Sequence, residues 1–294
     1  MNKHASRLVQ ATKGWNTSLK TYSEQPKGQF GRIAKIETGA VTLNSDEIDF
    51  EFTVPFDDDT EANEAEITIY NLSNQTISGI KYNKNLTITA GYKEDTGVIF
   101  SGYVSKVKTR KEGIDKITTV YALDDMDLKE RDLANVTYDG GTNASYILKD
   151  LIGKVHLPVA AFNPKRDWIY EDSVTVDGGL MDNIRKYAKV CGISVYINKG
   201  KIYARHLSEG NNLYFNVSAD TGLIGSPEQN VETISAEDYN DEVTTYSCKM
   251  ILQHRINTAG IINLSSQNFS GEFRVKSGKH TFNQSEAITE FTCI

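Results

Sequence analysis

The chain has 294 residues and a formal net charge of −7, which leaves room for two or three domains of roughly 100–150 residues each. Its one short basic block is Lys108–Gly113, so the concentrated basic face of a nucleic-acid-binding protein is not expected. The three cysteines lie far apart and none stands in a C-x-x-C pair, which argues against a disulfide scaffold and against a zinc site.

The N-terminal segment, MNKHASRLVQATKGWNTS, lacks the apolar core of a signal peptide. No window reaches the ~18 apolar residues that a membrane-spanning helix needs. We therefore expect a protein that folds in a reducing, cytoplasmic compartment, without Sec export and without a membrane span. Residues 1–25 are polar and weakly patterned, and we expect them to form an N-terminal arm outside the core.

Residues 26–132 are predicted to form a first β-barrel domain. The segment Ile48–Phe56 alternates apolar and polar residues, as a half-buried strand does. Pro55 has no N–H to donate, so this strand is expected to end there or to lie at a sheet edge. The segment Asn74–Asn85 has room for one helical turn. Further strands are predicted at Gly31–Glu37, Ala65–Asn71, Asn85–Tyr92, Gly97–Lys108 and Lys116–Asp124.

Residues 133–216 change pattern and predict a small α+β module. One helix is expected within Gly141–Val155, with Thr142 or Asn143 as its N-cap. A second is expected within Gly178–Ile193, where apolar residues recur at helical spacing. Two short strands joined by a turn follow, within Ile193–His206.

Residues 217–294 return to the β pattern and predict a second β-barrel domain. The segment Asn216–Val243 is predicted to be a loop. No short-period repeat is evident. The predicted fold class is therefore mainly β, with two tube-type barrels flanking an α+β module. The strands of the second barrel are expected at Thr244–Gln253, Gly260–Asn268, Gly271–Phe282 and Glu286–Ile294.

Few residues in the sequence point to catalysis. No two of the five histidines show the spacing of a metal pair. Cys191 is the one cysteine near a predicted helix, but it lies at the C-terminal end, where the helix dipole opposes a thiolate. We therefore expect core cysteines, no catalytic residue, no metal site and no cofactor.

An acidic run, Asp57–Glu66, begins with the adjacent residues Asp57, Asp58 and Asp59. A calcium loop would carry alternating ligands and a central glycine, which this run lacks. A solvated loop is the simplest interpretation, and a weak cation site or a contact with a partner protein is the alternative. Asp57, Asp58 and Asp59 are therefore kept as candidate partner-interface residues.

The order of these features resembles the phage baseplate and tail hub proteins, of the late-control-protein-D-like kind. The resemblance covers roughly residues 30–294, and it rests on the order and spacing of motifs that are weak individually. The matching motifs lie at Ile69–Ser73, Ala90–Tyr92, Ile99–Val104, Gly140–Gly153, Asp177–Ala188, Gly200–Tyr203, Leu223–Pro227, Val243–Ile256 and Gly271–His280.

The resemblance implies a structural protein of a contractile phage tail or of a phage-tail-like bacteriocin (a tailocin), and no enzyme. Two barrels from each of three subunits would form a pseudo-sixfold ring, a symmetry adapter between the tail tube protein and the central spike protein. Other baseplate proteins would surround this homotrimer, in a particle assembled in the bacterial host cytoplasm. This chain is shorter than the hubs of large contractile phages, so piercing and wall cleavage are expected of other chains.

Two alternatives remain open on the sequence. A tail-tip protein that binds a receptor or glycan would use exposed aromatic side chains, for which Trp15 and Trp168 are the available tryptophans. A tail-associated peptidoglycan hydrolase would need Cys191 with a histidine, or a pair of carboxylates such as those at Asp57–Asp59, in a cleft.

Overall fold

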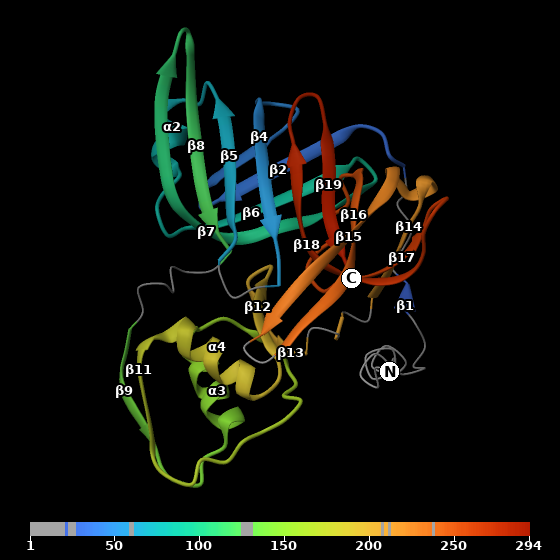
Figure 1. Cartoon of the computed structure of the whole chain (residues 1–294). Coiled ribbons are helices and arrows are strands. Elements are labelled where there is room, and N and C mark those ends of the chain that lie inside the picture. Colours follow the sequence, from blue (N-terminus) through green and yellow to red (C-terminus); the bar gives the residue numbers. More distant parts are fainter. Residues whose placement is uncertain are drawn as a thin grey trace.

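The computed structural model describes residues 21–22, 28–58, 62–124, 132–206, 209–210, 213–236 and 239–294. Two β units lie together, and a smaller module with helices α3 and α4 lies beside them (Figure 1). The predicted mainly-β fold with an α+β insert is confirmed. Most of the predicted N-terminal arm, residues 1–25, lies outside the described residues; Thr21–Tyr22 form β1, which pairs in parallel with β14 (Leu213–Val217).

In the first β unit every predicted strand is present. Phe50, Phe52 and Val54 of β4 are buried in one apolar cluster, as their alternation predicts. The strand β4 continues past Pro55 to Phe56 and lies between β18 and β5, and Pro55 pairs with β18. Pairing with β5 has already ended at Thr53, so no N–H is needed at Pro55 on the β5 side. The elements are β2 (Arg32–Thr38), β3 (Val41–Asn44), β4 (Phe50–Phe56), β5 (Glu64–Tyr70), α2 (Asn74–Gly79), β6 (Asn85–Tyr92), β7 (Asp95–Glu112) and β8 (Asp115–Leu123).

The middle module has its own buried cluster, built by one face of each helix and by the strands around them. Both predicted helices and the predicted hairpin are present. Three strands were not predicted, because each is short or irregular. The elements are β9 (Asp132–Tyr138), α3 (Ala144–Gly153), β10 (Val159–Phe162), β11 (Val174–Gly179), α4 (Leu180–Val190), β12 (Ser194–Asn198) and β13 (Lys201–Arg205).

The second β unit contains one large departure from the sequence prediction. The predicted loop Asn216–Val243 is wrong, because it contains the long strand β15 and the start of β16. Pro227 and Gly225 lie at a bulge in β15, and polar residues follow, so the usual strand signals are missing. The elements are a 3₁₀ turn η3 (Ala219–Thr221), β15 (Leu223–Ala236), β16 (Tyr239–Ile251), β17 (Ile261–Ser265), β18 (Ser270–Phe282) and β19 (Ala287–Cys293).

Eight strands form one continuous antiparallel layer through both β units, which we call the wall. Their spatial order is β15-β16-β19-β18-β4-β5-β8-β7. The two units repeat the same topology within the wall: each contributes four strands, and in both sets the spatial order by position in the chain is first, second, fourth, third. The third strand of the second unit, β18, pairs with the first strand of the first unit, β4.

The repeat extends to irregular detail. In both units the third strand is long and pairs along its first half with a strand outside the wall, β6 or β17. In both it then pairs with the fourth strand across a register shift, between Val104 and Lys106 of β7 and between Val275 and Ser277 of β18. Such a bulge bends a strand, so both units turn from the wall into their outer layer in the same way.

Candidate functional site

The candidate functional site is an extended surface, the polar face of the wall. The opposite face is apolar and covers the buried clusters. On the polar face, Lys249 and Lys279 lie on either side of Glu290, with Nζ to carboxylate oxygen distances of 3.8 and 3.0 Å. These side chains are partly exposed, so the pairs add little stability. Their effect is to keep the face hydrated and mixed in charge.

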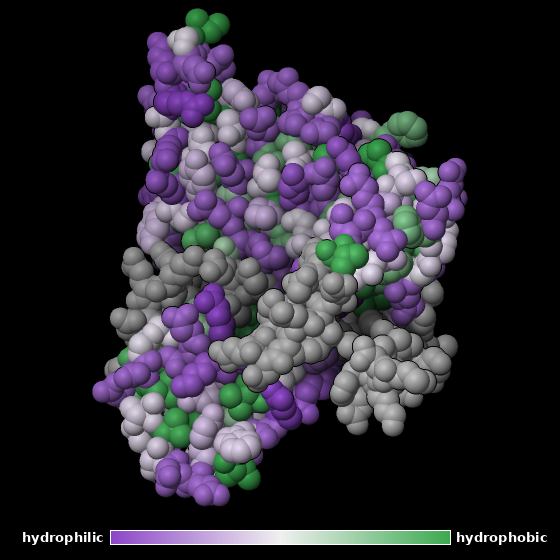
Figure 2. All heavy atoms as spheres, viewed as in Figure 1, coloured by the Kyte–Doolittle hydropathy of each residue, from purple (hydrophilic) through white to green (hydrophobic). Residues whose placement is uncertain are grey.

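The polar face continues across the first β unit. The Lys108 ammonium lies 5.5 Å from the centre of the Tyr121 ring, within the range of a cation–π contact. Figure 2 shows that hydrophilic and intermediate residues cover most of the visible side above β4, β5 and β8. Across these strands, successive opposite positions are Thr53, Glu66, Tyr121 and Lys106.

A shallow groove of about 790 Å³ crosses this face from β15 to β4. Its floor includes Gly278, where the wall passes from one unit to the other. Ile224 of β15 lies at one side of the groove and the Lys249–Glu290–Lys279 ion pairs lie within it. An open, mixed-charge groove of this shape fits a protein surface better than an enclosed small molecule.

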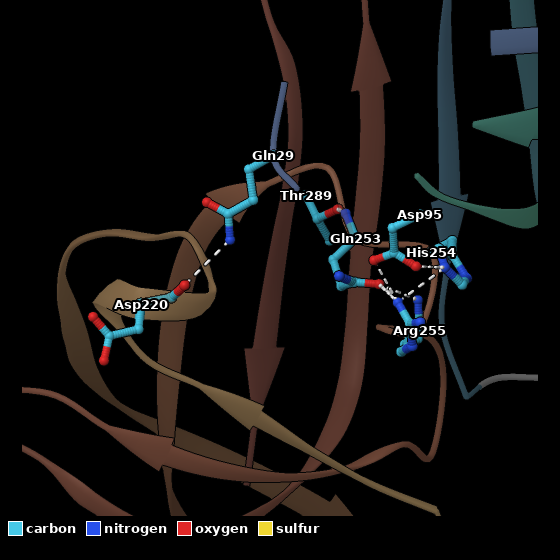
Figure 3. Close-up of polar contacts among 7 residues, drawn as sticks. All are labelled: Gln29, Asp95, Asp220, Gln253, His254, Arg255 and Thr289. Carbon is cyan, nitrogen blue, oxygen red and sulfur yellow. Dashed lines mark hydrogen bonds and ion pairs between the residues drawn. The ribbon is translucent and has the colours of Figure 1, made fainter. Parts of the chain in front are cut away.

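A partly buried polar cluster joins the two units (Figure 3). Arg255 Nη1 donates to Asp95 Oδ2 at 2.7 Å and to Gln253 Oε1 at 3.0 Å, while His254 Nε2 lies 3.2 Å from Asp95 Oδ1. Burial alone would raise the pKa of Asp95, but the bonds from Arg255 and His254 outweigh it and the pKa is lowered. Nearby, Gln253 N donates to Thr289 Oγ1 at 2.9 Å. Asp95 therefore holds the β6–β7 turn against the segment that follows β16.

The turn between β12 and β13 anchors the middle module to the same segment. Lys199 Nζ donates to the carbonyl oxygen of His254 at 3.2 Å, and burial lowers the Lys199 pKa to about 8. Asn198 Nδ2 donates to Asn257 Oδ1 at 3.1 Å. Asp95 and Arg255 are 160 positions apart, and no spacing in the sequence predicts that they meet.

Within the middle module, Asp167 caps α3 from outside the helix. Asn143 is at the predicted N-cap position, but its side chain makes no capping bond. Instead, Asp167 Oδ1 accepts from the Ser145 backbone N–H at 2.9 Å, and Asp167 Oδ2 accepts from Asn143 Nδ2 at 3.0 Å. Burial would raise the Asp167 pKa, but the bonds from Ser145 and Asn143 lower it.

Replacing Asp167 with alanine is expected to lower the free energy of unfolding by about 1 kcal/mol, because the first turn of α3 loses its cap. Asp172→Ala, a change of an exposed aspartate in the same connection, is the matched control and is expected to stay within about 0.5 kcal/mol of the parent. Urea denaturation of both variants measures the difference. Equal effects would show that Asp167 does not act as a cap.

The predicted interface candidates make contacts within the chain. Asp58 Oδ2 accepts from Arg274 Nη1 at 2.7 Å, and Arg274 is almost fully buried. The carbonyl oxygen of Asp57 accepts from Thr258 Oγ1 at 2.9 Å. Asp59 lies outside the described residues. That these three aspartates contact a partner protein stays a prediction.

The groups considered for catalysis are mostly enclosed. Burial raises the pKa of the Cys191 thiol to about 11, and Cys248 and Cys293 are also buried and free. Among the described residues, no group of three His, Cys, Asp or Glu side chains could hold a metal ion. No helix in the described part of the chain is long and apolar enough to cross a membrane.

No protein-family model matches the chain, and no curated protein matches its sequence. Solved structures do match. The 43 kDa tail protein of prophage MuSo2 from Shewanella oneidensis aligns with a TM-score of 0.62 at 9% identity, over 89% of this chain and 97% of that one. The tail protein from Neisseria meningitidis MC58 aligns with a TM-score of 0.63 at 8% identity, over 90% and 96%.

A third match is the E. coli c3393 protein, a type VI secretion component with structural similarity to the T4 bacteriophage tail proteins gp27 and gp5. It aligns with a TM-score of 0.62 at 11% identity, over 88% of this chain and 76% of that one. At these identities the matches establish the fold. The resemblance read from the sequence is confirmed at that level: over most of its length, this chain has the fold of phage tail proteins and of a type VI secretion component.

Proposed function

We propose that the protein is a structural baseplate or tail hub protein. Three copies form a pseudo-sixfold ring that joins the tail tube protein to the central spike protein. The observation that carries this proposal is the repeat within the wall: each copy supplies two sets of four wall strands with the same topology, so three copies supply six similar sets. The shared fold of the tail proteins supports the setting.

The proposal divides the chain into an arm (1–25), a first barrel (26–132), a middle module (133–216) and a second barrel (217–294). The polar face of the wall suits the inside of a tube, because mixed charges such as the Lys249–Glu290–Lys279 ion pairs hold water. The particle is a phage or a tailocin, assembled in the host cytoplasm, with other baseplate proteins around the ring. No catalytic step and no cofactor enter this proposal.

An exposed apolar patch on the middle module favours a second candidate, a tail-tip protein that binds a receptor or glycan. Trp168 and Tyr146 are 61% and 63% exposed, and both lie by the start of α3, where the Ala144 N–H donates to the Trp168 carbonyl. Aromatic side chains of this kind recur at binding surfaces. In a hub, the same patch would contact a neighbouring baseplate protein.

Cryo-electron microscopy of the native tail end tests the proposal through copy number and symmetry. The expected result is three copies in a pseudo-sixfold ring between tube and spike. Six equivalent copies would make the protein a tube or adaptor ring instead. Copies at the periphery, near cell-wall contacts, would favour the receptor-binding candidate or a hydrolase.

A further inference from the structure

The wall has a free edge at each end. At one end, β7 pairs with β8 on one side, and beyond Val104 no strand among the described residues pairs with its other side. At the other end, β15 pairs with β16 alone among the described strands. Unpaired strand edges of this length are sites where another chain adds on, unless they are blocked.

The chain already contains the joint that these two edges could make. Inside one copy, the third strand of the second unit (β18) pairs with the first strand of the first unit (β4). The free edges belong to the corresponding strands: β7 is the third strand of the first unit and β15 is the first strand of the second. A pairing of β7 of one copy with β15 of another would therefore repeat the internal β18–β4 pairing.

We propose that β7 of one copy pairs in antiparallel fashion with β15 of the next, which continues the wall around the ring. This inference rests on the proposed ring and adds which surfaces meet. The wall has an even number of alternating strands, so rotation about an axis along the strands brings its two ends together antiparallel. At about 4.8 Å per strand, 24 strands from three copies give a circumference of roughly 115 Å before tilt.

The internal joint also gives the register. Aligning the units at their shared bulge equates Val104 with Val275, and therefore Val107 with Gly278. The same alignment makes Tyr121 of β8 equivalent to Thr292 of β19. Glu66 lies opposite Tyr121 and Ser247 lies opposite Thr292, so these two residues are also equivalent. Thr53 lies opposite Glu66 and Glu228 lies opposite Ser247, which makes Thr53 equivalent to Glu228.

Inside the copy, Gly278 pairs with Phe56 and Thr281 pairs with Thr53. The equivalent pairs between copies are Val107 with Val231 and Arg110 with Glu228.

The chemistry of these pairs fits. Val231 is 61% exposed, whereas Phe56, its equivalent at the internal joint, is 8% exposed. Arg110 and Glu228 are exposed and opposite in charge, and in the single copy Arg110 pairs with the equally exposed Glu112 of its own strand at 3.2 Å. The free part of β7 also carries Lys106, Lys108 and Lys111 and one acidic residue, Glu112, whereas β15 has glutamates but no lysine or arginine. Opposite charges favour pairing of one copy with the next over pairing of two like edges.

Lysines at a strand edge can also serve to block pairing, and a cysteine scan separates the two roles. The double variants Thr109→Cys/Gln229→Cys and Lys108→Cys/Asn230→Cys cover adjacent opposite pairs, one of which is the close, non-hydrogen-bonded kind that suits a disulfide. Oxidation of the full-length protein with oxidised glutathione is expected to give a covalent ladder that ends at the trimer. Single variants, and Thr109→Cys/Thr42→Cys on the β3 edge, are expected to give no such ladder.

A charge exchange tests the register independently. Arg110→Glu is expected to weaken association at least tenfold in sedimentation equilibrium, and Arg110→Glu/Glu228→Arg is expected to restore it. If the lysines only block pairing, Arg110→Glu leaves association unchanged and the inference fails. A ring that forms without either cross-link overturns this inference alone. A chain found without ring symmetry in its native particle overturns the proposed function as well.

Discussion

Replacing Gly278 with alanine is expected to lower the free energy of unfolding by about 3 kcal/mol, because the position is overpacked for any side chain. Gly278 lies in β18 where the wall passes into β4. An added Cβ would lie 2.5 Å from Phe56 Cζ and 2.8 Å from Phe291 Cβ, and closer still to the Glu290 carbonyl oxygen. Two of these neighbours are backbone-bound atoms that cannot rotate away. Guanidinium denaturation followed by circular dichroism measures the loss.

Gly271→Ala is the matched control for Gly278→Ala, because both glycines belong to β18. At Gly271 the added Cβ would meet the edge of the Phe273 ring at 3.2 and 3.3 Å, and a side chain can give by a few tenths of an ångström. We expect a change below about 1 kcal/mol. Comparable losses in the two variants would mean that the close contact at the joint does not decide the stability of β18.

Much of the first β unit could be predicted from the sequence because its strands are central and half-buried. In β4, the phenylalanines at positions 50, 52 and 56 and Val54 face the cores while the residues between them face water. Such a strand carries its own pattern. The helices of the middle module were predictable for the same reason, since each buries one stripe against strands.

The strand β15 could not be predicted, and the repeat explains why. Its residue Gln229 occupies the place that Val54 holds in β4, and Pro227 occupies the place of Phe52. The strand β4 has a neighbour along each edge within the same copy, β18 and β5, and its apolar residues alternate regularly. In the single copy β15 has an open side, and its polar residues, with Gly225 and Pro227, match the pattern of a loop.

The candidate site was predicted only in part. The aspartates at 57 and 58 were singled out from sequence as an acidic run, but Asp58 contacts Arg274, more than 200 positions later. The cluster of Asp95, His254 and Arg255 gave no signal, because Asp95 begins β7 directly after a turn and the other two lie in a connection, where polar residues are ordinary. Contacts of this range follow from topology, and local sequence does not encode them.

Two buried groups should give the stability of this protein opposing responses to acid. Burial raises the pKa of Asp124 to about 7, although it accepts hydrogen bonds from Asn63 N at 2.8 Å and Nδ2 at 3.1 Å. Between its ordinary pKa and about 7 the folded state therefore holds the extra proton, and stability falls as pH rises. Burial lowers the pKa of His280 to about 3. Between about 3 and its ordinary pKa the unfolded state holds the extra proton, and stability rises with pH.

From about pH 4 to 6.5 these two terms nearly cancel in the parent protein, and the lowered pKa values of His206 and His254 leave a shallow net rise with pH. In Asp124→Asn the cancelling term is gone, so the free energy of unfolding should fall by about 1.4 kcal/mol or more for each pH unit below 6.5. In His280→Asn the opposite slope should appear, reduced by the smaller contributions of His206 and His254. The slope of unfolding free energy against pH, from urea titrations at half-unit intervals, reports this independently of any packing cost of either substitution. Parallel curves for the parent and Asp124→Asn would mean that Asp124 is ionised in the folded protein throughout this range, and that its buried carboxylate is stabilised by more than the two bonds from Asn63.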